Sequence, residues 1–145
     1  MNIDSASFFD GLADEMNAHP EQFRVLGECD MSAALVMRKP DGDFAIRVAF
    51  EGLSCAGVTP IAAETAGSAA DFYLDGPLSA WQVMFDDILA NGAASGRLTI
   101  NSLALLGTDI RLRGDDPMGT DKFSRFNQTL QEYLDGAART AVAAG

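Results

Sequence analysis

Apolar residues recur at steps of three and four near the start of the chain, which predicts an amphipathic helix over positions 5–18. The apolar side of this helix carries Phe8, Phe9, Leu12 and Met16. Asp4 or Ser5 can cap its first turn. His19-Pro20 should end it, because the residue before a proline avoids helical geometry.

Further along, apolar and polar side chains alternate with period two, which predicts a β-hairpin. A short strand is expected first, at 23–26. The strands of the hairpin are expected at 33–39 and 44–51, and the turn at 40–43 contains a proline and a glycine that suit a tight reversal. One face of the second strand carries Phe44, Ile46, Val48 and Phe50.

The middle of the chain predicts two strands and a helix. A strand is expected near 58–64, within a segment rich in small residues, and another at 71–75. A helix should begin at Pro77, because proline is favoured in the first helical turn, and Asn91-Gly92 should end it. Its apolar stripe consists of Leu78, Trp81, Met84, Phe85, Ile88 and Leu89.

The last third is expected to add a strand at 95–101 and a closing helix at 117–138. Periodicity leaves positions 102–113 open between a helix and a strand. The closing helix presents Phe123, Phe126, Leu130, Tyr133 and Leu134 on one face. The small residues of 137–145 are expected to fray.

These elements predict an α+β domain and not a doubly wound α/β fold. Because the strands show one apolar and one polar face, a single five-stranded, mostly antiparallel sheet should be covered by helices on one side. The chain of 145 residues has the length of one domain, expected over 1–145 with its core at about 5–135.

Composition and charge exclude several classes of protein. Hydrophobic residues make up 48% and charged residues 21%, as in ordinary globular domains. Positions 1–7 do not read as a signal peptide, and no run of about 18 apolar residues predicts a transmembrane helix. The net charge of −11 disfavours nucleic acid, and it disfavours anionic bilayers unless a local basic spot exists. We expect a soluble, acidic, cytoplasmic protein.

Candidate chemistry is sparse. Cys29 and Cys55 have no CxxC spacing; two free thiols are the simpler expectation, and a single disulfide between them stays open. His19, the one histidine, reads as a surface residue, and the pairs Asp86-Asp87 and Asp115-Asp116 read as solvated surface. No cofactor, metal cluster, phosphate-binding glycine loop or nucleophile motif is predicted. An acid acting with Tyr73 or Tyr133 in an apolar pocket stays open as a catalytic alternative.

The segment 71–85, which reads Asp-Phe-Tyr-Leu-Asp-Gly-Pro-Leu-Ser-Ala-Trp-Gln-Val-Met-Phe, resembles the sterol carrier protein type 2 (SCP2) family in its succession of strand, turn and aromatic-bearing helix. The glycine-led segment 95–100 and the Asp41-Gly42 turn are similar to that family too, and the resemblance extends from about Phe8 to Leu134. Asn101-Ser102 and the C-terminal Ala-Ala-Gly depart from the family's usual Gly-Asp and peroxisomal signal.

The resemblance implies a five-stranded sheet with helices over one face, enclosing an apolar tunnel for sterols, fatty acids or their CoA esters. It favours a non-catalytic lipid-binding or lipid-transfer protein. The best candidates for the pocket lining are Trp81, Met84, Phe85, Ile88, Phe123 and Phe126.

Family members also serve as accessory or dimerising domains, so a structural module and a homodimer stay open. The sheet face expected to serve such pairing carries Ala45, Arg47, Ala49, Tyr73 and Thr99. A small isomerase or cyclase acting on a hydrophobic substrate is a further alternative.

Overall fold

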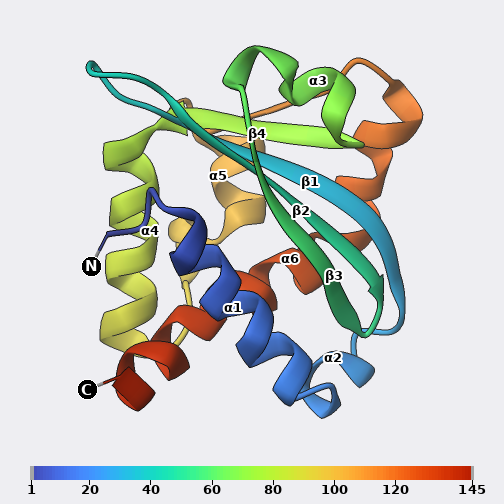
Figure 1. The fold of residues 1–145 in the computed structure, drawn as a ribbon, viewed down its shortest axis with the longest axis vertical. Helices are drawn as coiled ribbons and strands as arrows, with labels where there is room; N and C mark the ends of the chain where they lie inside the picture. The colour runs from blue at the N-terminus through green and yellow to red at the C-terminus, as the bar shows by residue number, and fades with distance from the viewer. Residues whose placement is uncertain (1, 145) are drawn as a thin grey trace.

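A computed structural model describes residues 2–144, with side chains through residue 140. Its centre is a five-stranded sheet in the order β3-β2-β1-β4-β5 (Figure 1). The strands are β1 (Cys29–Arg38), β2 (Phe44–Gly52), β3 (Ser54–Ile61), β4 (Phe72–Pro77) and β5 (Arg111–Arg113). Neighbouring strands are antiparallel except β1 and β4, which are parallel. The predicted α+β class with a mostly antiparallel sheet is confirmed.

Helices α1, α4 and α6 pack against one face of this sheet, while α3 lies on the other (Figure 1). The α-helices are α1 (Ala6–Ala18), α2 (Glu21–Arg24), α3 (Ala66–Ala69), α4 (Leu78–Asn91), α5 (Ile100–Leu106) and α6 (Pro117–Ala144). Two short 3₁₀ turns are η1 (Ala63–Thr65) and η2 (Gly96–Leu98). Among the described residues, no helix is both long enough and apolar enough to cross a bilayer.

Local signals place α1 and α4 where the pattern predicts them. The Oγ atom of Ser5 accepts a hydrogen bond from the Phe8 amide at 3.2 Å and caps the start of α1. Gly92 ends α4 in the left-handed conformation, with φ of 85°, and its amide donates to the Ile88 carbonyl. The start of α1 and the end of α4 are therefore fixed by their cap residues.

The predicted hairpin is confirmed as β1 and β2. The chain then reverses direction again, and the next strand begins earlier than expected. Gly52 has φ of 63°, a conformation that side chains resist, and β3 follows at Ser54 and not near position 58. Near the end of the hairpin, the pairing of β2 with β3 shifts register between Ala49 and Phe50 of β2. This bulge was not visible in the alternation of the sequence.

Two predicted strands are wrong. Positions 23–24 belong to the single turn of α2, whose Phe23 is buried in the core, and positions 25–26 form a turn after it. Positions 95–101 form η2 and the start of α5, because the Thr99 hydroxyl accepts a hydrogen bond from the Ser102 amide and caps a helix. The segment left open, 102–113, contains both structures: the rest of α5 and then β5.

The prediction of helices on one side of the sheet needs correction. Ala34, Val36 and Ala45 are buried on the second face beneath Ala66 of α3. Small side chains on these strands let the backbone of α3 approach closely. The centre of the sheet is therefore buried on both faces, which the alternation of β2 alone did not reveal.

The closing helix α6 runs through Ala144, six residues beyond the predicted end. Ala137 is buried in the core, and the Arg139 guanidinium pairs with Glu15 of α1 at 2.9 Å. The buried cluster thus extends from Ile3 to Ala137. The side chains of 141–145 lie outside the described residues, and fraying of this end stays a prediction.

Candidate functional site

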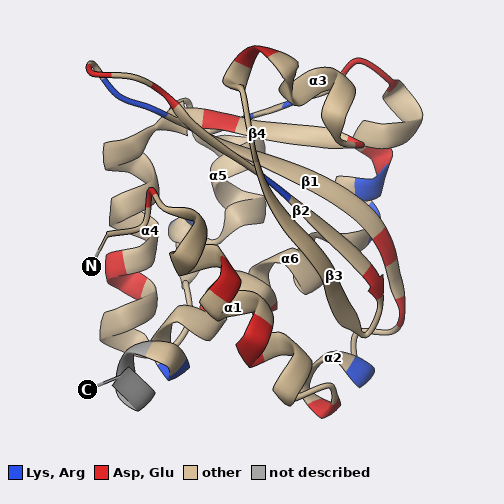
Figure 2. Ribbon diagram, in the orientation of Figure 1, with Lys and Arg blue, Asp and Glu red and all other residues tan. Residues whose placement is uncertain are grey.

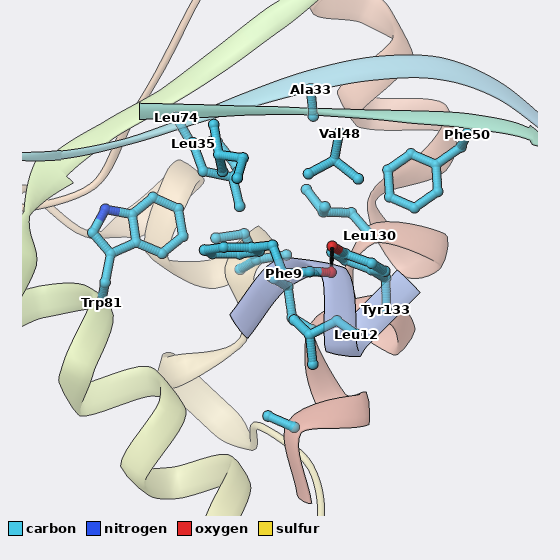
Figure 3. Close-up of a cluster of buried hydrophobic side chains, with 14 of the residues drawn as sticks. Phe9, Leu12, Ala33, Leu35, Val48, Phe50, Leu74, Trp81, Leu130 and Tyr133 are labelled. Atoms are coloured by element: carbon cyan, nitrogen blue, oxygen red, sulfur yellow. Dashed lines mark hydrogen bonds between the residues drawn. The ribbon is translucent and has the colours of Figure 1, made fainter. Parts of the chain in front are cut away.

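The space between the sheet and helices α1, α4 and α6 is filled by one apolar cluster (Figure 3). Side chains of β1, β2 and β4 meet those of the three helices there. Among residues 2–140, the buried polar side chains are Thr129 and Asp135. The buried methionines are Met16, Met31, Met37 and Met84. Unbranched thioether side chains can change shape at low cost, so this interior is suited to rearrangement.

The six side chains predicted to line a pocket all lie in or against this cluster. Trp81, Met84, Phe85, Ile88 and Phe123 are buried, and Phe126 is half-buried beneath the Arg125 guanidinium, which lies 5.1 Å from its ring centroid. None of the six lines either of the two surface cavities described below. Their role as a ligand lining therefore stays a prediction.

Aromatic contacts and buried hydrogen bonds hold this interior together. The indole N–H of Trp81 donates to the Val36 carbonyl of β1 at 3.0 Å, which ties α4 to the centre of the sheet. The ring of Phe85 meets Phe8 of α1 edge to face at 5.1 Å. Such contacts favour a well-packed interior.

Tyr133 lies inside the cluster, with its hydroxyl donating to the Phe9 carbonyl at 2.9 Å (Figure 3). Burial raises the pKa of Tyr133 well above its ordinary value. Tyr73 lies instead on the second face of the sheet, beside the alanines under α3. Within the described residues, neither tyrosine forms a hydrogen bond with a carboxylate, so the predicted acid–tyrosine pair is not assembled.

Asp135 is the buried acid, with 6% of its surface exposed. Its Oδ1 atom accepts from the Ala94 amide at 3.1 Å and from the Gln131 side-chain amide at 2.8 Å. Burial raises the pKa of Asp135, and these two hydrogen bonds act against that rise. Its role is to hold the segment after α4 against α6.

A groove of about 430 Å³ opens beside α5, on the helical side of the molecule. Its lining consists of Arg97, Leu98, Ser102, Leu103, Leu106 and Gly107. Two leucines at the end of α5 remain largely in solvent: Leu105 is 64% exposed and Leu106 is 81% exposed. This groove was not predicted, because positions 95–101 were expected to form a strand. The uncharged run from Leu98 to Gly107 was the sequence signal that could have indicated it.

A second groove, of about 560 Å³, lies on the other face of the sheet and is polar. Arg47 spans part of it, and its Nε donates to the Ala69 carbonyl at 2.7 Å. Asp71 is held there by the Ser32 amide at 2.8 Å and by Lys122 at 3.4 Å. With both signs of charge present, this groove is not suited to an apolar guest.

Comparisons with solved structures match almost the whole chain. A crystal structure of sterol carrier protein 2 is 18% identical, with a TM-score of 0.69 over 94% of this chain and 98% of that one. A conserved hypothetical protein from Thermus thermophilus, described as a possible sterol carrier protein, is 19% identical, with a TM-score of 0.71 over 97% and 90%. The chain has an SCP2-like fold. No protein-family model and no curated protein matches it.

The departure at Asn101-Ser102 falls in the first turn of α5 in this SCP2-like fold. The Ser102 amide is bonded to the Thr99 hydroxyl, and the neighbouring Ile100 amide donates to Gln131 of α6 at 2.6 Å. The start of α5 is thus anchored to α6 without the usual Gly-Asp pair.

Three of the five residues predicted to form a free sheet face are placed differently. Ala45 is covered by α3, Arg47 is bonded to the Ala69 carbonyl of α3, and Thr99 caps α5 away from the sheet. The predicted pairing surface is therefore wrong in these positions. Whether the SCP2-like chain forms a homodimer stays a prediction.

The remaining polar candidates lie outside the interior. His19 is half-buried at the surface, with its Nδ1 3.1 Å from Glu21, while Asp86 and Asp87 bond to neighbours on the surface of α4. Within residues 2–140, no group of three or more acidic, histidine or cysteine side chains could hold a metal ion. Both cysteines are free and buried, and burial raises the pKa of Cys29 to about 11, so neither thiol is set up as a nucleophile.

Proposed function

We propose that this protein binds a hydrophobic, lipid-like ligand such as a sterol or a fatty acyl chain, and that it catalyses no reaction on it. The observation that carries the proposal is the almost wholly apolar interior beneath a sheet arranged as in sterol carrier protein 2. Such an interior can receive a hydrocarbon guest, and it offers no converging polar groups for chemistry.

The ligand would lie between α4, α6 and the sheet, against Trp81, Met84, Phe85, Ile88, Phe123 and Phe126. An empty cavity of about 300 Å³ would cost on the order of 7 kcal/mol, a large part of a domain's stability of about 5–15 kcal/mol. The close packing of these side chains is consistent with that cost. Binding then requires the interior to open, with its methionines adapting to the guest.

Absence of catalysis is supported by the positions of the acids and tyrosines. The Tyr133 hydroxyl is engaged by the Phe9 carbonyl, and Asp135 is engaged by a backbone amide and a glutamine. A general acid or base has to reach the substrate at hydrogen-bond distance. Neither group is presented to a guest in the apolar interior.

The first test is native mass spectrometry of freshly purified protein, followed by extraction and identification of any released molecule. A stoichiometric acyl chain, sterol or quinone is the expected result. In parallel, fatty acid or cholesterol is titrated while the emission of Trp81, the single and buried tryptophan, is recorded. No bound molecule together with unchanged emission for every ligand would overturn the proposal.

A variant pair on α4 tests the location. Phe85→Leu removes buried ring carbons, and two ligand methylenes filling that space at ~0.8 kcal/mol each should tighten binding about tenfold. Val83→Ala, on the exposed side of the same helix, is the matched control and should leave the affinity unchanged. Equal affinities for the two variants would place the ligand elsewhere.

A further inference from the structure

The α5 patch is a surface on which apolar side chains are flanked by arginines, and it consists of Leu98, Leu103, Leu105 and Leu106 with Arg97 and Arg111. Leu106, 81% exposed, also lines the groove between η2 and α5. Two adjacent leucines held in solvent at the end of a seven-residue helix are unfavourable unless something covers them.

The patch is continuous with the interior. Ile100 of α5 is buried, and Leu103 packs against the same cluster that contains the predicted ligand lining. The helix is tied to α6 by the hydrogen bond from the Ile100 amide to Gln131. Helix α5, with one face on the apolar interior and the other in solvent, is therefore a thin wall between the interior and the solvent.

Charge distinguishes this part of the surface from the rest. The segment 96–113 carries three arginines against Asp109, a balance of +2, within a chain of net charge −11, so the remainder carries −13. Helix α5 itself has no charged residue (Figure 2). Arg97 lines the groove. The Nε of Arg111 donates to the carbonyl of Thr108 at 3.4 Å, and Thr108 follows Leu106 by two residues.

These arginines are available to an outside partner. Among the described residues, neither Arg97 nor Arg111 forms an ion pair, whereas Arg38, Lys39 and Arg139 each pair with an acid. An anionic surface would be attracted by this patch and repelled by the rest of the molecule, which orients the contact. A second copy joined patch to patch would bring the arginines together, so charge disfavours that occupant.

We propose that the α5 patch docks onto an anionic lipid surface, with Leu105 and Leu106 inserted among the acyl chains and Arg97 and Arg111 at the headgroups. This rests on the proposed function and extends it, because α5 is then the wall across which the ligand is exchanged with a bilayer. Exposed apolar side chains flanked by arginines give contacts of this kind, which depend on lipid charge.

The test is co-sedimentation with vesicles of phosphatidylcholine alone or mixed with phosphatidylglycerol, at low and at high salt. Wild-type protein should bind the mixed vesicles and lose binding as salt screens the arginines. The double variant Leu105→Ser/Leu106→Ser should bind at least about tenfold more weakly. Met118→Ser, which changes a side chain that is 79% exposed elsewhere, is the matched control and should bind like wild type.

The charges are tested separately. Arg97→Gln and Arg111→Gln should each weaken binding to the mixed vesicles about fivefold, while Arg24→Gln, on exposed α2, should not. The docking proposal is overturned if wild-type protein does not bind the mixed vesicles. It is also overturned if the double leucine variant binds them as tightly as wild type does. Dimerisation in ultracentrifugation that the double leucine variant abolishes would overturn it as well, in favour of a second copy.

Ligand uptake in solution distinguishes the ligand-binding proposal from the docking proposal. All these variants change exposed side chains and should bind a soluble fatty acid, measured by Trp81 emission without vesicles, as wild type does. Uptake without vesicle binding would remove the docking proposal alone. Vesicle binding by a protein that takes up no ligand would remove the proposed function alone.

Discussion

Asp135 shows how one buried side chain makes stability depend on pH. Its surroundings raise its pKa above the ordinary value of 3.8, so the folded protein binds a proton in a pH range where the unfolded chain does not. The contribution of this group to stability is therefore greatest at low pH and is lost as the pH rises through the raised pKa. At a pH above the raised pKa, the buried carboxylate lowers the stability of the folded protein.

Asp135→Asn should raise the urea midpoint at neutral pH, because the amide oxygen can keep both accepted hydrogen bonds without a buried charge. The advantage should shrink as the pH falls toward 3.8. The measurement is urea unfolding followed by circular dichroism across this range. Asp86→Asn, on the exposed side of α4, is the control, and an advantage independent of pH would contradict the argument.

Single positions also show how far a sequence pattern can identify a site. The spacing of Trp81, Met84, Phe85 and Ile88 predicted one buried face of a helix, and all four are buried. The same spacing cannot separate a packed core from a ligand lining, because both require apolar side chains at the same steps. Arg97 and Leu106 were missed as a pair, since they line one groove only because of the way η2 and α5 fold.

At the scale of elements, two glycines in helices have opposite roles. Gly11 lies in α1, where an added Cβ would meet no atom within 4 Å. Gly119 lies in the first turns of α6, where an added Cβ would clash with the Asp71 backbone just before β4. The second glycine is thus required for the close approach of α6 to the sheet.

Gly11→Ala should stabilise the protein by about 0.5–1 kcal/mol, because alanine restricts the unfolded chain and favours the helix. Gly119→Ala should destabilise it by about 1–3 kcal/mol, because helix α6 has to shift. Thermal unfolding of the two variants beside wild type measures both. A stabilising Gly119→Ala would mean that α6 can move away from Asp71 without cost.

At the scale of the whole molecule, acids outnumber bases by 21 to 10. Several bases are engaged in pairs, including Arg38 with Asp75 and Asp43, and Lys39 with Asp4. Figure 2 shows the acids distributed over α1, α4, the strands and the loops. Since most of the acids have no paired base among the described residues, their mutual repulsion should work against the compact state.

Raising sodium chloride from about 10 mM to about 0.5 M should therefore increase the melting temperature by about 2–4 °C, which is roughly 1 kcal/mol for a domain of this length. Chloride is used because sulfate would strengthen apolar burial by itself. Differential scanning calorimetry measures the shift. A melting temperature that falls with salt would show that the ion pairs outweigh the repulsion.

Local pattern alone determined α1, the β1–β2 hairpin and α4, together with the α+β class. Each of these has its hydrogen-bond partners within a few residues or across one tight turn, so periodicity and cap residues such as Ser5 and Gly92 carry the necessary information. The resemblance to sterol carrier proteins rested on that same succession of elements.

The tertiary structure decided the rest: the parallel pairing of β1 with β4, the cover of α3 on the second face, and the conversion of an expected strand into η2 and α5. The physical reason is that these features depend on partners distant in the chain. The alternation of Leu98 and Ile100 suits a strand or a capped helix equally, and the distant Gln131 contact, with the Thr99 cap, favours the helix. The exposed leucines and the groove beside them exist only because of that outcome.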